Sequence, residues 1–346
     1  MTAGDEGLPR TRRVRYKGTH PRRFEDKYKE LDPAAHAAEL RKVMERGHTP
    51  AGTHRPICVR EILEALAPKS GETFLDATLG YGGHAQELLP RLLPGGRLFG
   101  LDVDPLELPR TEARLRALGF GDDVLTVRRM NFAGIAGLLP EAGGFDGVLA
   151  DLGVSSMQID NPTRGFTYKA EGPLDLRLNP GRGRPASALL QAASEEDLEE
   201  ILRENADEPN AAILARALHG RTVATTTQLA GLVREALRGA FREAERQREL
   251  RKVLQRTFQA LRIAVNDEFT VLDQFLSLLP RCLKPGGRVA ILTFHSGEDR
   301  RVKKAFQAGR REGLYRDAAP EPVRPSPEEQ RANPRSSGAK LRWAIR

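Results

Sequence analysis

The chain has 346 residues and a net charge of +8, and 39% of its residues are hydrophobic while 29% are charged. This length allows one large domain or two, with a sizeable core. No apolar run approaches the ~20 residues of a membrane helix, and no apolar signal core is present, so we expect a cytoplasmic protein. The two cysteines lie far apart and lack metal-ligand spacing, which favours reduced thiols and no metal site.

The positive charge is placed unevenly along the chain. Residues 300–346 hold 13 Lys/Arg against 5 Asp/Glu, which leaves the remainder near neutral. Residues 1–50 are rich in Arg, Lys, Pro and His with little apolar periodicity, and we predict a basic, partly disordered N-terminal arm there. Basic segments favour a polyanionic substrate, although a solvated surface explains the charge equally well.

A folded domain is predicted to begin near residue 54. Apolar residues at helical spacing indicate a helix over 56–66. The stretch 73–84, TFLDATLGYGGH, is predicted to be a buried strand that runs into a glycine turn, with a helix over 85–93 after it. Glycines take positive φ and let a ligand approach the backbone, and the amides at the start of a helix bind anions.

Three further apolar strands are predicted at 97–102, 124–127 and 145–151. Because strands and helices alternate, we expect a parallel α/β sheet with helices on both faces and ligands beyond the carboxyl ends of the strands. An acid after the second strand is typical of sites that bind ribose hydroxyls, so we predict a nucleoside-cofactor site. The glycine spacing is not the dinucleotide fingerprint, and no Walker Lys-Ser/Thr follows. The residues at the strand ends are Gly82, Asp102, Phe132 and Asp151.

A helical insertion is predicted to interrupt this alternation. The next strong strand, 287–294, begins more than 130 residues after Asp151, far more than a parallel crossover needs. We therefore predict a small all-helical domain over 161–254, inserted into a sheet domain made of 51–160 and 255–346. Its expected helices are 189–203, 211–219, 227–237 and 238–253.

The chain is expected to return to the sheet through one long amphipathic helix. Apolar residues between Phe258 and Leu279 follow a single stripe, and 339–345 is predicted to be a closing strand. Within the insertion, Ser194 and Asp197 have the spacing of a capping box.

Two polar segments before the insertion and within its start have alternative interpretations. In 151–158, DLGVSSMQ, one interpretation is that Asp151 and Gln158 bind a cofactor or the amine of a base. The other is that an Asp or Ser of this segment only caps a helix. The loops 164–168 and 172–177 either stack a flipped base or pack at a domain seam.

Two more polar segments flank the last helix. In 294–300, FHSGEDR, His295 is either structural or acts as a base, a stacking group or a phosphate contact. No nucleophile elbow G-x-S-x-G precedes it, so a Ser-His-Asp triad is not favoured. In 333–342, Arg335, Lys340 and Arg342 either clamp phosphate or cover the sheet edge.

Together these motifs resemble the bacterial small-subunit (16S) ribosomal RNA cytosine-N(4) methyltransferase family, often called methyltransferase H. The matching stretches, in the family's order, are 76–84, 151–158, 164–166, 172–175, 257–268, 294–296 with 298–300, and 333–335. The chain departs from the family pattern at 54–58, 102–105, 205–208, 251–256 and Gly297 and by its basic arm. These departures indicate a divergent branch.

The resemblance implies a class I, Rossmann-like, S-adenosylmethionine-dependent methyltransferase with an inserted helical domain. Its implied substrate is a cytidine in the decoding centre of small-subunit ribosomal RNA, presented by the free RNA or by the assembled 30S subunit, and it implies no metal and no membrane. The implied cofactor-binding residues are Gly82, Gly83, His84, Asp102, Phe132, Asp151 and Gln158.

Site roles follow from the same resemblance and from the strand-end positions. We expect Asp151, His295 and Ser296 to act on the target base. We expect the insertion and the basic tail to contact RNA, through Arg164, Arg177, Arg300, Arg335 and Lys340. The alternatives are methylation of another RNA or DNA base and a non-catalytic, cofactor-binding ribosome assembly factor. The Asp/Asn/Ser-Pro-Pro-Tyr/Phe signature of DNA amino methyltransferases is absent after the fourth strand, where 151–154 read DLGV.

Overall fold

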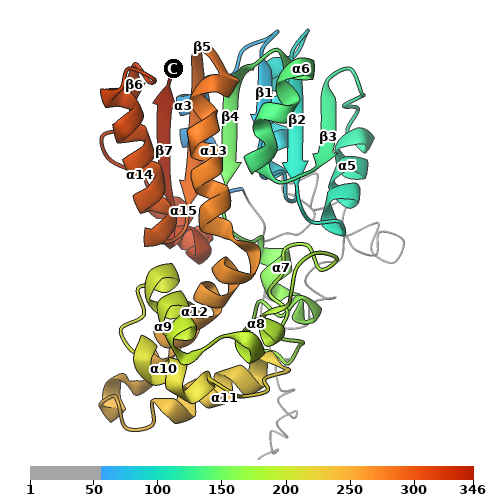
Figure 1. Ribbon diagram of the computed structural model, residues 1–346. Helices are drawn as coiled ribbons and strands as arrows, with labels where there is room; N and C mark the ends of the chain where they lie inside the picture. The colour runs from blue at the N-terminus through green and yellow to red at the C-terminus, as the bar shows by residue number, and fades with distance from the viewer. Residues whose placement is uncertain (1–55) are drawn as a thin grey trace, which may run out of the picture. The chain divides into compact units, whose positions relative to one another are not determined.

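The computed structural model describes residues 56–346, which contain one seven-stranded sheet (Figure 1). The predicted basic arm, residues 1–50, lies outside the described residues. The strand order is β3-β2-β1-β4-β5-β7-β6. The strands are β1 Thr73–Asp76, β2 Arg97–Asp102, β3 Leu125–Arg129, β4 Phe145–Asp151, β5 Leu283–Thr293, β6 Asp317–Ala318 and β7 Lys340–Ile345.

Helices connect the strands and fill the segment between β4 and β5. The helices outside that segment are α3 Val59–Leu66, α4 Gly83–Leu92, α5 Glu107–Ala117, η2 Phe132–Leu138, α6 Leu139–Ala142, α14 Ser296–Arg311, α15 Pro327–Ala332 and η4 Pro334–Gly338. Those between β4 and β5 are α7 Ser156–Asp160, η3 Pro162–Arg164, α8 Ala186–Ala192, α9 Glu195–Ala206, α10 Ala211–Leu218, α11 Thr226–Ala236, α12 Glu243–Asn266 and α13 Glu268–Cys282. None of the helices between residues 56 and 346 has the length and apolar character needed to span a lipid bilayer.

The predicted Rossmann-like α/β class is confirmed, but the expectation of a parallel sheet is wrong at one edge. β3, β2, β1, β4 and β5 are parallel neighbours, whereas β7 runs antiparallel to both β5 and β6. α14 carries the chain from β5 across to β6. The chain then returns through β7 into the gap between β5 and β6, and such a return needs no crossover helix because it reverses direction.

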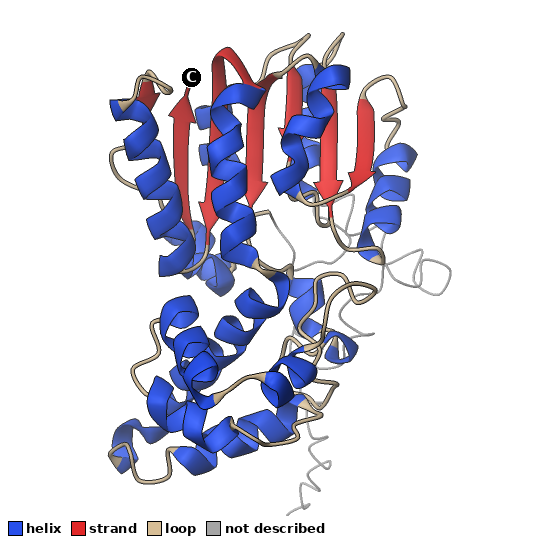
Figure 2. Cartoon of the chain, in the orientation of Figure 1, coloured by secondary structure: helices blue, strands red, loops and turns tan. Residues whose placement is uncertain are grey.

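Successive side chains of a strand point to opposite faces of the sheet, because the side chains of a strand repeat every two residues. Leu75 and Phe99 face a core shared with α13 and α14, while Phe74 and Leu98 face a core shared with α3, α4 and α5. The helices are seen on the two faces in Figure 2. This double coverage explains why the central strands read as continuous apolar runs.

The segment between β4 and β5 has an apolar core of its own. Its buried residues come from between Phe166 and Leu261 and from α8 to α12. The predicted capping box is confirmed at the start of α9, where Ser194 accepts from the amide of Asp197 and the Asp197 side chain accepts from the amide of Ser194. α12 runs without a break through residue 254, so the proposed end of the insertion falls inside a helix.

The predicted single long helix after the insertion is wrong, because the helix breaks at Asp267. Asp267 has φ +50°, which ends α12 and begins α13. The neighbouring Asn266 side chain holds this corner: its amide nitrogen donates to the carbonyl of Leu176 and its oxygen accepts from the amide of Leu178, both at 2.8 Å. The apolar stripe continues across the break, which is why periodicity alone did not reveal it.

Candidate functional site

Three carboxylates lie at the carboxyl ends of neighbouring parallel strands. Asp76 ends β1, Asp102 ends β2 and Asp151 ends β4. The strand arrowheads of Figure 2 show this shared edge of the sheet. Parallel open sheets place their ligands at this edge. The structure therefore brings two predicted acids, Asp102 and Asp151, to one end of the sheet, together with Asp76, to which no role had been assigned.

A glycine turn leads from β1 into α4. Gly80 and Gly82 have φ of +47° and +79°, which other residues rarely adopt. A Cβ on Gly82 would lie 3.0 Å from the Cγ2 atom of Thr111, so α5 also requires glycine there. A Cβ on Gly83 would lie 3.1 Å from Pro56. With Gly82 as N-cap, no side chain caps α4, so the amides of its first turn are open to an anionic ligand.

Asp102 joins β2 to this glycine turn. Its Oδ2 atom accepts from the Gly80 amide at 2.8 Å, and its Oδ1 atom accepts from the Asp104 amide at 2.9 Å. A carboxylate has about four acceptor positions, so both oxygens keep capacity for two ribose hydroxyls. Burial raises the pKa of Asp102, although these amide hydrogen bonds oppose the shift.

Asp151 presents a carboxylate oxygen with no hydrogen bond. Its amide donates to the Thr78 hydroxyl at 2.6 Å, while its Oδ1 atom is buried and has no partner among residues 56–346. Burial, and after it the charge of Glu298, raises the pKa of Asp151 to about 7. A buried acceptor without a partner is costly unless a ligand completes it. This atom fits a donor such as the amine of a base or of a cofactor.

His84 lies beside this carboxylate as a neutral imidazole. Its Nε2 atom is 3.0 Å from the carbonyl of Ile57 and therefore donates to it. Burial lowers the pKa of His84, so its Nδ1 atom carries no proton. Nδ1 lies 3.6 Å from Asp151 Oδ2, too far for a hydrogen bond. His84 thus fixes the segment before α3 and packs one side of Asp151.

Asp76 makes folding stability depend on pH. It is 1% exposed, and burial raises its pKa to about 7 against the opposing hydrogen bond from the Thr78 amide. The folded state therefore keeps this proton to higher pH than the unfolded state does, so stability falls as pH rises from about 4 through about 7. Asp76→Asn stays neutral and keeps an acceptor for the Thr78 amide, which Asp76 Oδ1 binds at 3.1 Å.

We compare the melting temperature of Asp76→Asn with that of the unsubstituted protein at each pH. The difference, variant minus unsubstituted protein, is expected to be larger at pH 8 than at pH 5, because only the unsubstituted protein loses stability as pH rises. Each unit of pKa difference corresponds to about 1.4 kcal/mol, so the change is measurable by thermal unfolding. Asp122→Asn is the matched control because Asp122 is 97% exposed. The same difference at both pH values would show that Asp76 does not titrate between them.

Phe132 and Gln158, two further predicted cofactor residues, are held by contacts within the chain. Phe132 begins η2 and packs edge-on against Phe275, with ring centroids 5.0 Å apart. Gln158 forms a capping box with Ser155 at the start of α7, and its Nε2 atom donates to Asp104 Oδ2 at 2.8 Å. Of the residues 151–158, Ser155 is therefore the one that caps a helix, whereas Asp151 Oδ1 has no hydrogen-bond partner among the described residues.

His295 and Ser296 lie at the start of α14. His295 Nδ1 accepts from the Glu298 amide at 3.4 Å, and its Nε2 atom lies 3.2 Å from Glu298 Oε1. Burial alone would raise the pKa of Glu298, but His295 and Arg262 outweigh it and the pKa is lowered. The negative charge of Glu298 therefore acts both on His295, which it contacts, and on Asp151, whose pKa it raises. Ser296 instead donates to Asp207, at the end of α9, at 2.9 Å.

The five arginines and lysines predicted to contact RNA differ in their surroundings. Arg300 and Arg335 are partly exposed and pair with Asp207 and Asp160. Arg177 pairs with Asp175, and Lys340 with Asp299. Arg164 alone is buried, and its guanidinium binds Asp104. That burial favours a structural role for Arg164 over contact with a substrate.

Sequence reasoning missed several residues that hold the site together. Asp76 and Asp104 fall within quoted motifs, and their position at or just after a strand end was the available signal. Glu298 was quoted in its motif without a role. Arg262 and Asn266 fall within the matching stretch 257–268 but were given no role. Arg262 forms a two-pronged ion pair with Glu268 at 2.8 Å across the helix break, and Asn266 binds the distant Leu176, so neither partner was apparent from the sequence.

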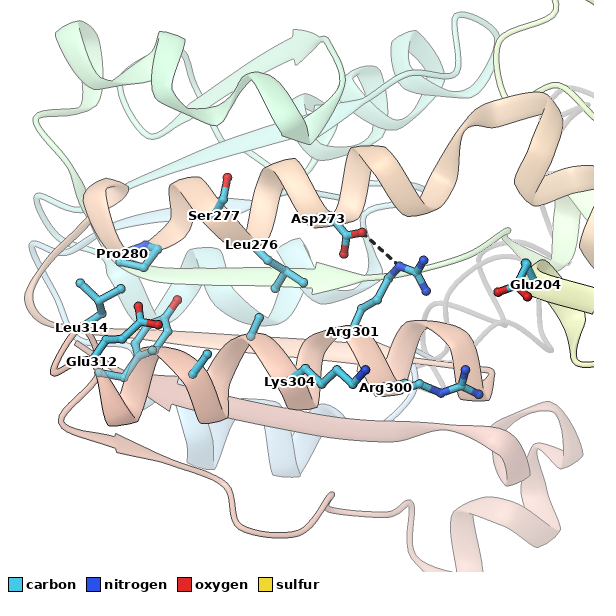
Figure 3. A pocket seen from close by; sticks show the side chains of 14 residues that line it. Glu204, Asp273, Leu276, Ser277, Pro280, Arg300, Arg301, Lys304, Glu312 and Leu314 are labelled. Carbon is cyan, nitrogen blue, oxygen red and sulfur yellow. Dashed lines mark hydrogen bonds and ion pairs between the residues drawn. The ribbon is translucent and has the colours of Figure 1, made fainter. Parts of the chain in front are cut away.

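A pocket of about 770 Å³ lies elsewhere, between α13 and α14 (Figure 3). Of the predicted site residues only Arg300 lines it. Its charged lining consists of Glu204, Asp273, Glu312, Arg300, Arg301 and Lys304. The ion pair between Asp273 and Arg301, at 3.2 Å, is drawn there. With acids and bases in balance, this pocket gives no reason to expect a polyanion, and the strand-end cluster remains the candidate site.

Known proteins are similar to this chain over nearly its whole length. A model of the MraW methylase family matches residues 51–346. Ribosomal RNA small subunit methyltransferase H 2 of Alkaliphilus metalliredigens is 56% identical over 342 residues, which cover 97% of this chain and 98% of that protein. Ribosomal RNA small subunit methyltransferase H 1 of Lachnoclostridium phytofermentans is 52% identical over 340 residues, which cover 97% and 93%. The chain therefore belongs to the MraW methylase family.

Proposed function

We propose that this protein transfers a methyl group from S-adenosylmethionine to the N(4) amine of a cytidine in small-subunit ribosomal RNA, at the decoding centre. The observation that carries the proposal is the buried, unpartnered Oδ1 atom of Asp151 at the end of β4, in the same strand-end cluster as Asp102. The names of the relatives support ribosomal RNA of the small subunit as the substrate. The enzyme would work in the cytoplasm, where that RNA is found.

The residues present fit the cofactor. Asp102 would bind the ribose hydroxyls with its remaining lone pairs. The amides at Gly83 and His84, at the start of α4, would bind the carboxylate of the methionine part. Phe132 would pack against the adenine, and Gln158 would hold Asp104 and the loop after β2 in place. When bound, S-adenosylmethionine supplies an electrophilic methyl sulfonium.

The chain's own contribution to the reaction is mainly orientation and charge stabilisation. The amine of cytosine is a weak nucleophile because its lone pair is delocalised into the ring. Asp151 would accept a hydrogen bond from one N–H of the amine. This hydrogen bond aligns the amine and stabilises the positive charge that develops on it as the N–C bond forms, and Asp151 would then take the proton. His295 and Ser296 would position the base from the start of α14.

RNA contact would extend beyond this site. We assign it to the proposed helical domain, residues 161–254, and to the basic segment 300–346. This segment ends the proposed sheet domain, which consists of residues 51–160 and 255–346. Arg300 and Arg335 are the best placed of the predicted residues, because their side chains are partly exposed. Arg177 and Lys340 would exchange their present acidic partners for phosphate.

The test is methylation of unmodified small ribosomal subunits, and separately of free ribosomal RNA, with labelled S-adenosylmethionine. Nucleoside mass spectrometry should find the label in N(4)-methylcytidine, and fragment mapping should locate it. Label in another nucleoside would replace the proposed target base. Cofactor binding without label in any ribosomal RNA would overturn ribosomal RNA as the substrate and leave the two alternatives, methylation of another RNA or DNA and a non-catalytic, cofactor-binding assembly factor.

A further inference from the structure

A buried ion pair joins the loop after β2 to the last residue of η3. Asp104 is 1% exposed and Arg164 is 6% exposed, and Arg164 Nη1 donates to Asp104 Oδ2 at 2.7 Å. Gln158 Nε2 donates to the same oxygen at 2.8 Å. The other oxygen of Asp104 accepts from the amides of Leu106 and Glu107, at 2.9 and 3.3 Å. Every direction around this carboxylate is therefore used.

The other side of the Arg164 guanidinium holds a second loop. Its Nη2 atom donates to the carbonyls of Arg177 and Leu178, at 3.2 and 2.8 Å. Asn266 binds the same loop from the corner between α12 and α13, through Leu176 and Leu178. Leu176 has φ +63°, a conformation that a leucine keeps only where its surroundings impose it. Arg164 and Asn266 thus hold residues 176–178, the end of the loop 172–178, in one conformation.

The same ion pair is connected to the strand-end cluster. The Asp104 amide donates to Asp102 Oδ1, and Asp102 Oδ2 accepts from the Gly80 amide. An unbroken series of hydrogen bonds therefore runs from the glycine turn, through Asp102, Asp104 and Arg164, to residues 172–178. A buried charge pair tolerates little displacement, because an uncompensated buried charge is costly.

We propose that Arg164 is a positioning residue that couples cofactor binding at Asp102 to the ordering of residues 172–178. The proposal rests on the proposed function, which places the ribose at Asp102. Arginine suits this task because its rigid, planar guanidinium donates to a carboxylate on one side and to two carbonyls on the other. A lysine has a single charged nitrogen and cannot serve all three acceptors in this geometry.

The coupling is tested by hydrogen exchange measured by mass spectrometry, with and without S-adenosylhomocysteine as the probe. In the unsubstituted protein, the probe should slow exchange both at 102–107 and at 172–178. In Arg164→Lys, the probe should slow exchange only at 102–107, and its affinity measured by calorimetry should fall about tenfold, within the usual range of coupling between sites. A merely structural arginine would change stability without separating the two segments.

Arg116→Lys is the matched control. Arg116 also binds an acid and a carbonyl, Asp122 at 2.7 Å and Phe120 at 3.1 Å, but it is 26% exposed and lies on α5. It should show the unsubstituted pattern. Asp104→Asn is a second variant in case Arg164→Lys fails to fold, because it keeps the shape of the side chain and one carbonyl oxygen. In this variant too, the probe should slow exchange at 102–107 but not at 172–178.

The outcomes separate the two proposals. No response at 102–107 in the unsubstituted protein would overturn the proposed cofactor site and the coupling with it. A response at 102–107 without one at 172–178 would overturn the coupling alone, as would a full response at 172–178 in Arg164→Lys or Asp104→Asn.

Discussion

Asp151→Asn is expected to lower the turnover number of methyl transfer by about 10²–10³-fold, the range found when one group that stabilises transition-state charge is removed. The asparagine keeps the size of the side chain and one acceptor oxygen, but it can neither carry a negative charge nor take a proton at neutral pH. The measurement is initial-rate methylation of small ribosomal subunits at saturating cofactor.

The pH dependence of this reaction gives a second readout of Asp151. Its pKa is raised to about 7, and the ionised form is the one that accepts the amine N–H. The turnover number should therefore rise with pH from about 6 to about 8 and then level off. In Asp151→Asn this rise should be missing, whereas a merely structural aspartate would leave the shape of the profile unchanged.

Asp146→Asn controls for a general effect on β4. Asp146 lies at the other end of that strand and binds the Thr73 amide at 2.8 Å and Lys284 at 2.6 Å. This variant should keep both the rate and the pH profile. Unsubstituted activity and an unchanged profile in Asp151→Asn would refute the catalytic role of Asp151.

Asp102→Ala is expected to weaken cofactor binding by at least about 100-fold. Hydrogen bonds to a charged group contribute about 1.5–3 kcal/mol each, and the proposed ribose contact has two of them. The alanine also leaves the Gly80 and Asp104 amides without their acceptor, so the glycine turn loses its link to β2. Calorimetric titration with S-adenosylhomocysteine measures the change.

A graded pair of variants sharpens the Asp102 result. Asp102→Asn keeps one acceptor oxygen and should lose less affinity than the alanine. Asp122→Ala removes an exposed aspartate that pairs with Arg116 at 2.7 Å, and it should bind the probe normally. Equal affinity in Asp102→Ala and in the unsubstituted protein would exclude Asp102 as the ribose ligand.

The parts of the fold that depend on local pattern were predictable from the sequence. The strands ending at Asp102 and Asp151 are short apolar runs bounded by turn residues, and the structure has both strands with these ends. The capping box at Ser194 was readable because its two partners are three residues apart. The placement of β7 between β5 and β6 was not, because strand order depends on pairing between distant segments.

The candidate site was predictable to the same extent. Strand-end position identified Asp102 and Asp151, since parallel strands bring their carboxyl ends to one edge. Asp104 lies in the loop after β2 and Arg164 at the end of η3, and neither has a periodic pattern that predicts the other. The break at Asp267 was hidden for a related reason, because the apolar stripe of α12 continues into α13 across it.

The pairing of β4 with β5 determines when the sheet can be completed during folding. Gly147 pairs with Arg288, so the whole helical segment must be synthesised before β5 can join β4. Closing so long a loop costs little equilibrium stability but slows folding. Until then the free edge of β4 is open to pairing with other chains. The separate apolar core between Phe166 and Leu261 can form first, and pulse-labelled refolding should protect the amides of α9 and α12 before those of β5.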